Sequence, residues 1–459
     1  VSQDGKTWTF HLRKNKWADG KDVTADQYVY SIKRTLAKDT ASDYAYLLIG
    51  SGIKGASDYN EGKCSQDEVG VKALDDLTLQ ITLDHPCGYF TKLLSNKLFA
   101  PQREDFVNKY GDKYGQTAES IPCNGPFKLT FFQNGSKIEL VKNNDYWDKN
   151  KVKLNKVTMM FLKDENARMD SLMNKQIDLC EVDKKEWIDK FSKLSNFFQI
   201  KSDYPEINYN VFNLKNKYFS NEKIRKAFSL VVDKNAYFKA VGGQVGKPSY
   251  GLVPYSVQIG NDEYRNKVPE ELKDDKEDPK ELLKEGLKEI GADEDTSKIT
   301  INYLIPGTDQ VNKDEADYMI NVVKNKFGIN IKCKFDEWAQ YLNDSEKGDY
   351  DMCISDWIGD YNDPMTFFDM WETGADIEHD SWSDKNYDSL VEDAKNTSDQ
   401  SRRLSDFEKA EKMLICDQAV IGTTYYGGRD VFTEKYVKGL ESPLFSSGDE
   451  LKYVYISGK

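Results

Sequence analysis

The sequence has few of the residues that build metal centres and disulfide frameworks. Its 459 residues include only three histidines, far apart and never in a helical His-x-x-x-His pair: His11, His85 and His379. The seven cysteines include no Cys-x-x-Cys pair. We therefore interpret most of them as small buried apolar residues rather than disulfide partners or zinc ligands. We expect no metal site and no cofactor.

Excess basic charge and long apolar runs are also lacking. Lys and Arg total 64 against 78 for Asp and Glu, which gives a formal net charge of −14. A nucleic-acid-binding protein needs a cationic surface that displaces counterions from phosphates, so we expect no nucleic-acid partner. No run of 18 apolar residues occurs, which argues against a membrane-spanning helix within these residues. The 39% of hydrophobic residues still suffices for packed cores, and this length corresponds to about three folding units.

Signature motifs of common enzymes are absent. The chain has no Gly-x-Ser-x-Gly nucleophile elbow and no Gly-x-Gly-x-x-Gly dinucleotide fingerprint. The sequence leaves open a pair of carboxylates of the kind that hydrolyses glycosides. Its 78 acidic residues produce chance neighbours, and no spacing singles out two of them. We expect a protein that is not an enzyme, with a secreted hydrolase as the alternative from a different class.

Local patterns predict a strand, a helix and several further strands in the first third of the chain. Residues 8–13 alternate large apolar and polar side chains, as in a half-buried strand. Thr24 and Gln27 form a capping box at the start of a helix, where Val23 can pack on Tyr28. Further strands are predicted at 77–83, 127–132, 137–141 and 157–162.

The second half of the chain alternates helices and strands, as an α/β lobe does. A strand, a helix and a strand in succession usually form a crossover unit with parallel strands. Ligands of open α/β sheets bind beyond the carboxyl ends of such strands, which draws attention to the loop over residues 355–364. The predicted elements are a helix over 224–231 capped by Ser220, a helix from Asp278 to Gly291, a strand over 299–304, a helix ending at Gly328, and strands over 329–335 and 350–354.

The loop over 355–364 contains two side chains suited to ligand binding. Asp360 can present a carboxylate to a ligand cation, and Trp357 can supply a flat apolar wall. The same segment also fits an ordinary turn with a packing tryptophan, because Asp-Tyr-Asn-Asp-Pro is a common turn composition. The residues alone leave both interpretations open.

A series of motifs runs in order through the whole chain. They are Asp-Gly-Lys-Thr-Trp-Thr-Phe-His-Leu-Arg at 4–13, Trp-Ala-Asp-Gly at 17–20, Asn-Asn-Asp-Tyr-Trp-Asp at 143–148, Ile-Arg-Lys-Ala-Phe-Ser at 224–229, the loop 357–364, and Asn-Tyr-Asp at 386–388. In order and spacing, from residue 1 to about residue 457, they resemble the solute-binding proteins of ABC importers for oligopeptides and dipeptides, which are extracellular solute-binding protein family 5.

The resemblance implies an α/β fold, a two-lobed periplasmic-binding-protein-like clamshell (type II, cluster C) with an extra subdomain. Members normally carry a further segment ahead of the Asp-Gly-Lys-Thr motif, so it also implies that this chain lacks its N-terminal segment. The implied division is the extra subdomain at 1–119 (its start missing), lobe I at 120–205, lobe II at 206–428, and a return to lobe I at 429–459.

The resemblance further implies a receptor that captures oligopeptides between its lobes and delivers them to the permease subunits of an ABC importer. An aspartate of this loop holds the peptide ammonium in the family, and Asp360 matches it. Positions that line the cleft are matched by Tyr44, Trp338 and Trp357, and we add Asp356 and Ile358 from the same loop. Two departures affect the ligand: Ile354 stands where some members place an arginine for the peptide carboxylate, and Asp356 adds an acid. Both departures bear on peptide length and on how the carboxyl end is held, and they favour cationic or longer ligands.

Other ligands and roles remain open at this stage. Related proteins accept oligosaccharides or metal chelates, and a signalling or adhesion role on the same scaffold is a further alternative. The resemblance implies a monomer outside the cytoplasmic membrane, either periplasmic or held there as a lipoprotein. Any lipid anchor would lie in the missing N-terminal segment.

Overall fold

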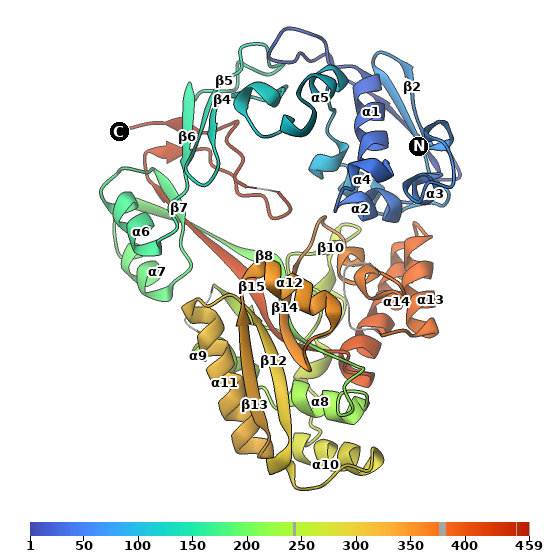
Figure 1. Ribbon diagram of the computed structural model, residues 1–459. Helices are drawn as coiled ribbons and strands as arrows, with labels where there is room; N and C mark the ends of the chain where they lie inside the picture. The colour runs from blue at the N-terminus through green and yellow to red at the C-terminus, as the bar shows by residue number, and fades with distance from the viewer. Residues whose placement is uncertain (242–244, 376–381, 447, 459) are drawn as a thin grey trace.

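The computed structural model describes residues 1–241, 245–375, 382–446 and 448–458. The chain forms three masses (Figure 1): the N-terminal residues through α5, the strands β4–β6 beside the C-terminus, and a large α/β lobe below them. Two long strands, β8 and β15, run together through the middle of the molecule. This arrangement confirms the predicted mixed α/β fold with sheet-based lobes.

The strands form five sheets in the described part of the chain, and one of them has seven strands. The strands are β1 (Thr7–His11), β2 (Val71–Asp75), β3 (Thr78–Thr82), β4 (Phe127–Gln133), β5 (Lys137–Lys142), β6 (Lys156–Met160), β7 (Leu179–Glu181), β8 (Phe197–Phe212), β9 (Gly246–Pro248), β10 (Gln258–Ile259), β11 (Asp262–Glu263), β12 (Thr300–Pro306), β13 (Asn330–Asp336), β14 (Met352–Ile358), β15 (Ile421–Glu434), β16 (Val437–Lys438) and β17 (Tyr455–Ile456).

The helices surround these sheets, and most of the longer ones belong to the α/β lobe (Figure 1). They are α1 (Ala25–Leu36), α2 (Ala45–Gly50), α3 (Ala56–Asn60), α4 (Phe90–Leu93), α5 (Glu104–Tyr110), α6 (Glu165–Met173), α7 (Lys185–Phe191), α8 (Glu222–Leu230), α9 (Lys234–Ala240), α10 (Pro279–Glu289), α11 (Gln310–Phe327), α12 (Trp338–Lys347), α13 (Lys385–Lys395) and α14 (Gln400–Lys412).

Most of the predicted elements are confirmed, and one cap is corrected. The capping box of Thr24 and Gln27 is present at the start of α1. Strands β12 and β13 are parallel, with α11 between them in sequence. Asn221 caps α8, rather than Ser220, because the Asn221 side chain accepts a hydrogen bond from the backbone N–H of Ile224 at 3.2 Å.

Strand β14 is longer than predicted and provides part of the site. The sequence predicted a strand ending at residue 354 and a loop from 355, but β14 continues to Ile358 because it stays paired with β8 as far as Glu206. Its other neighbour, β12, pairs only with Met352 and Cys353. Among the described residues, 355–358 therefore have a strand on one side and an open edge on the other.

Strands β8 and β15 cross from one mass of the molecule to another. Each runs through a limit of the division proposed from the sequence, β8 at 205 and β15 at 428. Their register shifts twice, between Thr423 and Tyr425 and again between Tyr426 and Gly428. The second shift lies beside β9, where a Cβ atom on Gly428 would be 2.6 Å from the backbone nitrogen of Gly246. Only glycine allows the backbones to approach so closely.

Hydrophobic cores lie on both sides of this crossing. Beyond it, α6 and α7 pack on one end of the two strands around Phe191 and Phe432. Within the α/β lobe, α8, α10 and α11 cover the sheet around Phe228 and Met319. The largest core joins the N-terminal segment to this lobe, and in it the rings of Tyr89 and Tyr361 stack with centroids 5.4 Å apart.

Most of the cysteines are buried in the structure. Four cysteines, Cys87, Cys180, Cys353 and Cys416, are buried, which confirms the interpretation of most of the seven as small apolar residues. His379 lies outside the described residues. Across the described ranges, no group of three or more His, Cys, Asp or Glu side chains could hold a metal ion. No helix within those ranges is both long and apolar enough to span a bilayer.

A buried ion pair fixes the segment that follows β14. Arg403 on α14 and Asp363 are both fully buried, and Arg403 Nη1 donates to Asp363 Oδ2 at 3.0 Å. Asp363 also accepts from the backbone N–H of Met365 at 3.2 Å. The pair thus ties the loop beyond Asp360 to a helix of the α/β lobe.

We expect Arg403→Met to lower the free energy of unfolding by about 3–5 kcal/mol, because the substitution leaves the Asp363 carboxylate buried without its cation. Urea denaturation followed by circular dichroism measures this loss. Lys298→Met is the control, since Lys298 forms exposed ion pairs with Asp293 and Asp295 and its loss should change the midpoint little. Equal midpoints for both variants would contradict the importance of the buried pair.

Candidate functional site

A cavity of about 1230 Å³ lies between the N-terminal segment and the α/β lobe. One wall consists of residues around α2 and Lys97, and the opposite wall consists of β14, the segment after it, and α12. Leu444, Phe445 and Ser446, from near the C-terminus, complete the lining. The cavity contains all six residues that the sequence analysis selected: Tyr44, Trp338, Asp356, Trp357, Ile358 and Asp360.

Backbone hydrogen bonds position the end of β14 in this cavity. The Gly359 N–H donates to the carbonyl of Pro205 on β8 at 2.8 Å. One residue further, the Asp360 N–H donates to Thr366 Oγ1 at 3.1 Å. A Cβ atom on Gly359 would lie 2.8 Å from the Phe367 ring, so the chain turns tightly against buried aromatic packing. Asp360 is therefore held by the scaffold rather than placed on a loose loop.

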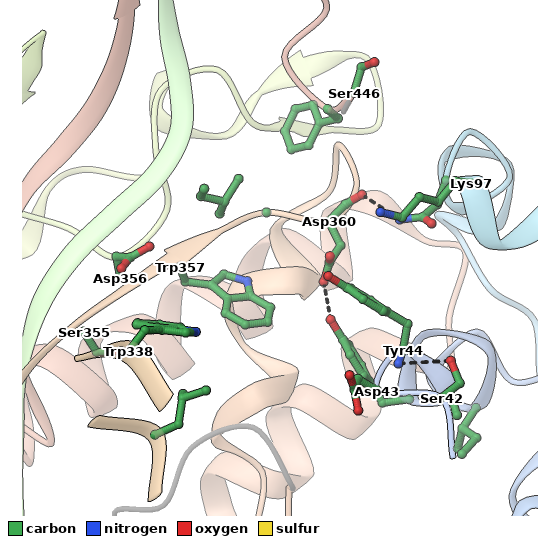
Figure 2. A pocket seen from close by; sticks show the side chains of 18 of the residues that line it. Ser42, Asp43, Tyr44, Lys97, Trp338, Ser355, Asp356, Trp357, Asp360 and Ser446 are labelled. Atoms are coloured by element: carbon green, nitrogen blue, oxygen red, sulfur yellow. Dashed lines mark hydrogen bonds between the residues drawn. The ribbon is translucent and has the colours of Figure 1, made fainter. Parts of the chain in front are cut away.

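The Asp360 carboxylate faces the N-terminal segment across the cavity (Figure 2). Tyr46 on α2 donates its hydroxyl to Asp360 Oδ2 at 2.7 Å. Burial raises the pKa of Asp360, while the Tyr46 hydrogen bond and the Lys97 charge act in the opposite direction. No ion pair to Asp360 occurs among the described residues. The site therefore contains a half-buried carboxylate with room for a cation.

Aromatic rings flank this carboxylate on both walls. Trp338 is 59% exposed and Tyr44 is 43% exposed, so both present ring surface to the cavity. The Trp338 ring stacks on Tyr341 at 5.5 Å, and the Tyr341 hydroxyl donates to the carbonyl of Ile354. The Lys97 ammonium lies 5.4 Å from the centre of the Tyr44 ring. These rings offer apolar contact area that does not depend on a particular ligand sequence.

Asp356 and Ile358 occupy the open part of β14, away from Asp360. In Figure 2, Trp357 lies between Asp356 and Asp360. Burial raises the pKa of Asp356, and no charged group lowers it. Ile358 is 44% exposed. Because neighbouring side chains of a strand alternate between faces, Asp356 and Ile358 share one face and Trp357 lies on the other.

Several residues of the site were not predicted from the sequence. Tyr46 lies 314 residues from Asp360 in sequence, and Asn96, whose side-chain amide donates to the Asp360 carbonyl at 3.5 Å, lies 264 residues away. Tyr204, Phe445 and Ser446 also line the cavity. No local pattern signals these contacts, because each depends on how distant segments pack together.

Comparisons with known proteins agree on one family. Residues 1–379 match the family described as bacterial extracellular solute-binding proteins, family 5 Middle. The dipeptide-binding protein DppE of Bacillus subtilis is 33% identical over 442 residues, which cover 96% of this chain and 79% of that protein. The structure of Listeria monocytogenes OppA bound to peptide aligns with a TM-score of 0.83 at 30% identity, covering 100% of this chain and 89% of that chain.

Two structures of MppA differ in how well they align. The murein tripeptide-binding protein MppA of Escherichia coli gives a TM-score of 0.83 at 26% identity, covering 99% of this chain and 88% of that chain. An unliganded open form of MppA gives 0.73 at the same 26% identity, covering 99% and 87%. The present arrangement is thus less similar to the open form.

We expect Asp360→Asn to melt at the same temperature as the unmodified protein or higher at pH 7, measured by differential scanning calorimetry. The folded state raises the pKa of Asp360, so its carboxylate reduces stability at pH values above that pKa. Stability is regained as the pH falls through the pKa of the folded state, and the difference between the two proteins should shrink there.

Asp363→Asn is the matched control, since it makes the same substitution three residues further along in a fully buried, ion-paired aspartate. This control should melt at a lower temperature. A lower melting temperature for Asp360→Asn as well would mean that Asp360 serves the fold rather than a ligand.

Proposed function

The chain belongs to the bacterial extracellular solute-binding proteins of family 5, and on this basis we propose that it captures oligopeptides and delivers them to the permease of an ABC importer. The relatives described above carry names that specify a dipeptide, a peptide and a murein tripeptide. One observation supports the proposal most directly: the half-buried Asp360 carboxylate, without an ion pair, lies just past the open edge of β14.

The open strand edge suits a peptide backbone. An extended peptide placed beside residues 355–358 can exchange main-chain hydrogen bonds with β14, which provides affinity without reading side chains. Asp360 then lies where the strand ends and can pair with the ammonium group of the first peptide residue. Such a counter-charge is needed because burying an unpaired ammonium group is very costly.

The size of the cavity also supports a peptide of several residues. Its volume of about 1230 Å³ exceeds the range of about 300–1,000 Å³ that is common for small-molecule pockets. The exposed rings of Tyr44 and Trp338 give apolar surface, and water can fill the space that a given side chain leaves. Such a cavity can accept many peptide sequences.

We infer that the α/β lobe and the rest of the molecule close on the ligand by bending β8 and β15. These strands connect the parts of the molecule, and their register shift between Tyr426 and Gly428 lies at the crossing. A hinge motion changes the backbone dihedral angles of a few residues, and residues at such a crossing can take up this change. The lower alignment score with the open form of MppA supports an arrangement with the lobes drawn together.

Further features of the proposal follow from the family. We propose a monomeric receptor outside the cytoplasmic membrane, with the permease subunits as its protein partners. The division at residues 119, 205 and 428, and the assignment of the six site residues, remain part of this proposal. Attachment through a lipid anchor stays a prediction.

The alternatives from the sequence analysis receive less support. The names of the relatives given above specify peptides rather than oligosaccharides or metal chelates. We propose that the protein releases its ligand chemically unchanged. Incubation of the purified protein with a pentapeptide, followed by mass spectrometry, should therefore show no new product, while the peptide raises the melting temperature. Cleavage products whose amount increases with the concentration of the protein would favour the hydrolase alternative.

The role of Asp360 can be tested with peptides whose amino end is free or acetylated. We expect acetylation of an alanine pentapeptide to weaken binding by about 2–5 kcal/mol in isothermal titration calorimetry, because it removes the cation that Asp360 pairs with. Asp360→Asn should lose a similar amount with the free peptide. The two losses should not add, because they remove the same interaction.

Asp43→Asn is the control for charge, since Asp43 lines the same cavity on the opposite wall. It should keep the preference for the free amino end. Equal affinity of the unmodified protein for both peptides would remove the ammonium site from the proposal.

A further inference from the structure

A group of carboxyl side chains lies around Asp356, which lines the cavity away from the Asp360 position (Figure 2). The pairing of β14 with β8 sets Asp356 opposite Asn208 and Ile358 opposite Glu206. Opposed residues of paired strands share a face, so Asp356 and Glu206 lie on the same face of the sheet. Electrostatic interactions connect Asp356 to Glu206 and to Glu315 on α11. We call Asp356, Glu206 and Glu315 the acidic face.

In the part of the chain that the structure describes, the acidic face has no cation of its own. Burial, with a smaller contribution from the charge of Asp356, raises the pKa of Glu206 and of Glu315 to about 7. Glu206 accepts a hydrogen bond from the Asn208 amide at 2.7 Å, and Glu315 is hydrogen-bonded to Tyr237. Among the described residues, no Lys, Arg or His lies close enough to lower the pKa of any of the three carboxyls.

Tyr425 on β15 brings a phenol hydroxyl close to the same group. Tyr425 on β15 is 9% exposed, and no hydrogen bond to its hydroxyl occurs within the described residues. Burial raises the pKa of this phenol most, and the charges of Glu315, Glu206, Asp356 and Asp309 raise it as well, so these carboxyls are near enough to act on it. A hydroxyl with no partner in the protein can donate a hydrogen bond to a ligand or to water and can accept one from either.

We propose that the acidic face, together with the Tyr425 hydroxyl, is a subsite for the cationic side chain of a captured peptide, a lysine or an arginine. This inference rests on the proposed function, since the peptide backbone beside β14 carries the side chain to the subsite. A Lys or Arg head group donates several hydrogen bonds and brings the positive charge that the three carboxyls lack. Asp356, which lines the cavity, makes the direct contact.

The geometry also indicates which peptide residue is read. If the ammonium end pairs with Asp360, the peptide extends back along β14 toward Asp356, four residues earlier in the chain. A strand and an extended peptide both advance by about 3.3 Å per residue, so Asp356 lies roughly 13 Å from the ammonium end. The subsite therefore binds the side chain at about the third to fifth position of the peptide. Because neighbouring side chains of an extended peptide alternate between faces, only one or two of these positions can place a side chain there.

A lysine scan of an alanine pentapeptide tests the proposal. In each peptide, one residue is replaced by lysine or by norleucine, which has a similar length but no charge, and affinities are measured by calorimetry. We expect lysine to bind about tenfold or more tightly than norleucine at one or two positions near the third to fifth. Asp356→Asn should remove most of this advantage, and Glu206→Gln should reduce it.

Two further variants keep the result independent of folding defects. Asp43→Asn makes the same charge change on the opposite wall of the cavity and should leave the advantage of lysine intact. Asp356→Lys should reverse the preference, so that glutamate binds more tightly than norleucine at the position where lysine was favoured. Melting temperatures of all variants, measured without peptide, identify any that fail to fold.

The outcomes separate this inference from the function on which it rests. If the alanine pentapeptide binds while lysine and norleucine peptides bind equally at every position, the acidic face is not a cation subsite and the receptor function stands. An advantage of lysine that survives in both Asp356→Asn and Glu206→Gln also overturns the inference. If no peptide binds at all, the proposed function and the subsite fail together.

Discussion

The antiparallel pairing of β8 with β15 is the interaction on which the rest of this structure depends. These strands pass from one mass of the molecule to another, and each contributes to the hydrophobic cores at both ends. Strand β14 is positioned by its pairing with β8, and Asp360 is positioned by β14. A change in the twist or bend of the pair therefore moves one wall of the cavity against the other, which is how a binding protein can couple capture to closure.

Uncompensated negative charge characterises the cavity. Burial raises the pKa of Asp356, Asp360 and Glu206, and the charge of Lys97 opposes this only in part and only at Asp360. In contrast, Asp363 is buried just outside the cavity with Arg403 as its partner. The ion-paired carboxylate therefore stabilises the fold, whereas the carboxylates of the cavity are available to a cationic ligand. Groups of the second kind reduce stability in the empty protein, and a cationic ligand offsets that cost.

Sequence patterns predicted elements better than they predicted contacts. The capping box of Thr24 and Gln27, the hairpin strands β4 and β5, and the parallel pair β12 and β13 depend on neighbouring residues or on short-range periodicity, and they are confirmed. The end of β14 was predicted too early, because residues 355–358 are strand only through their partner β8. The contact of Tyr46 with Asp360 was missed for the same reason, since it joins segments 314 residues apart.

The sequence by itself determined the family resemblance, the α/β lobe and the aspartate offered as a ligand for an ammonium group, because motifs and periodicity are local and survive without coordinates. Only the tertiary structure decided which residues face one another across the cavity. The open edge of β14, the Tyr46 hydroxyl on Asp360, and the meeting of Asp356 with Glu206, Glu315 and Tyr425 all arise from strand register and lobe packing. Burial then raises the pKa values of these carboxyls, and burial is a property of the packed chain rather than of any segment.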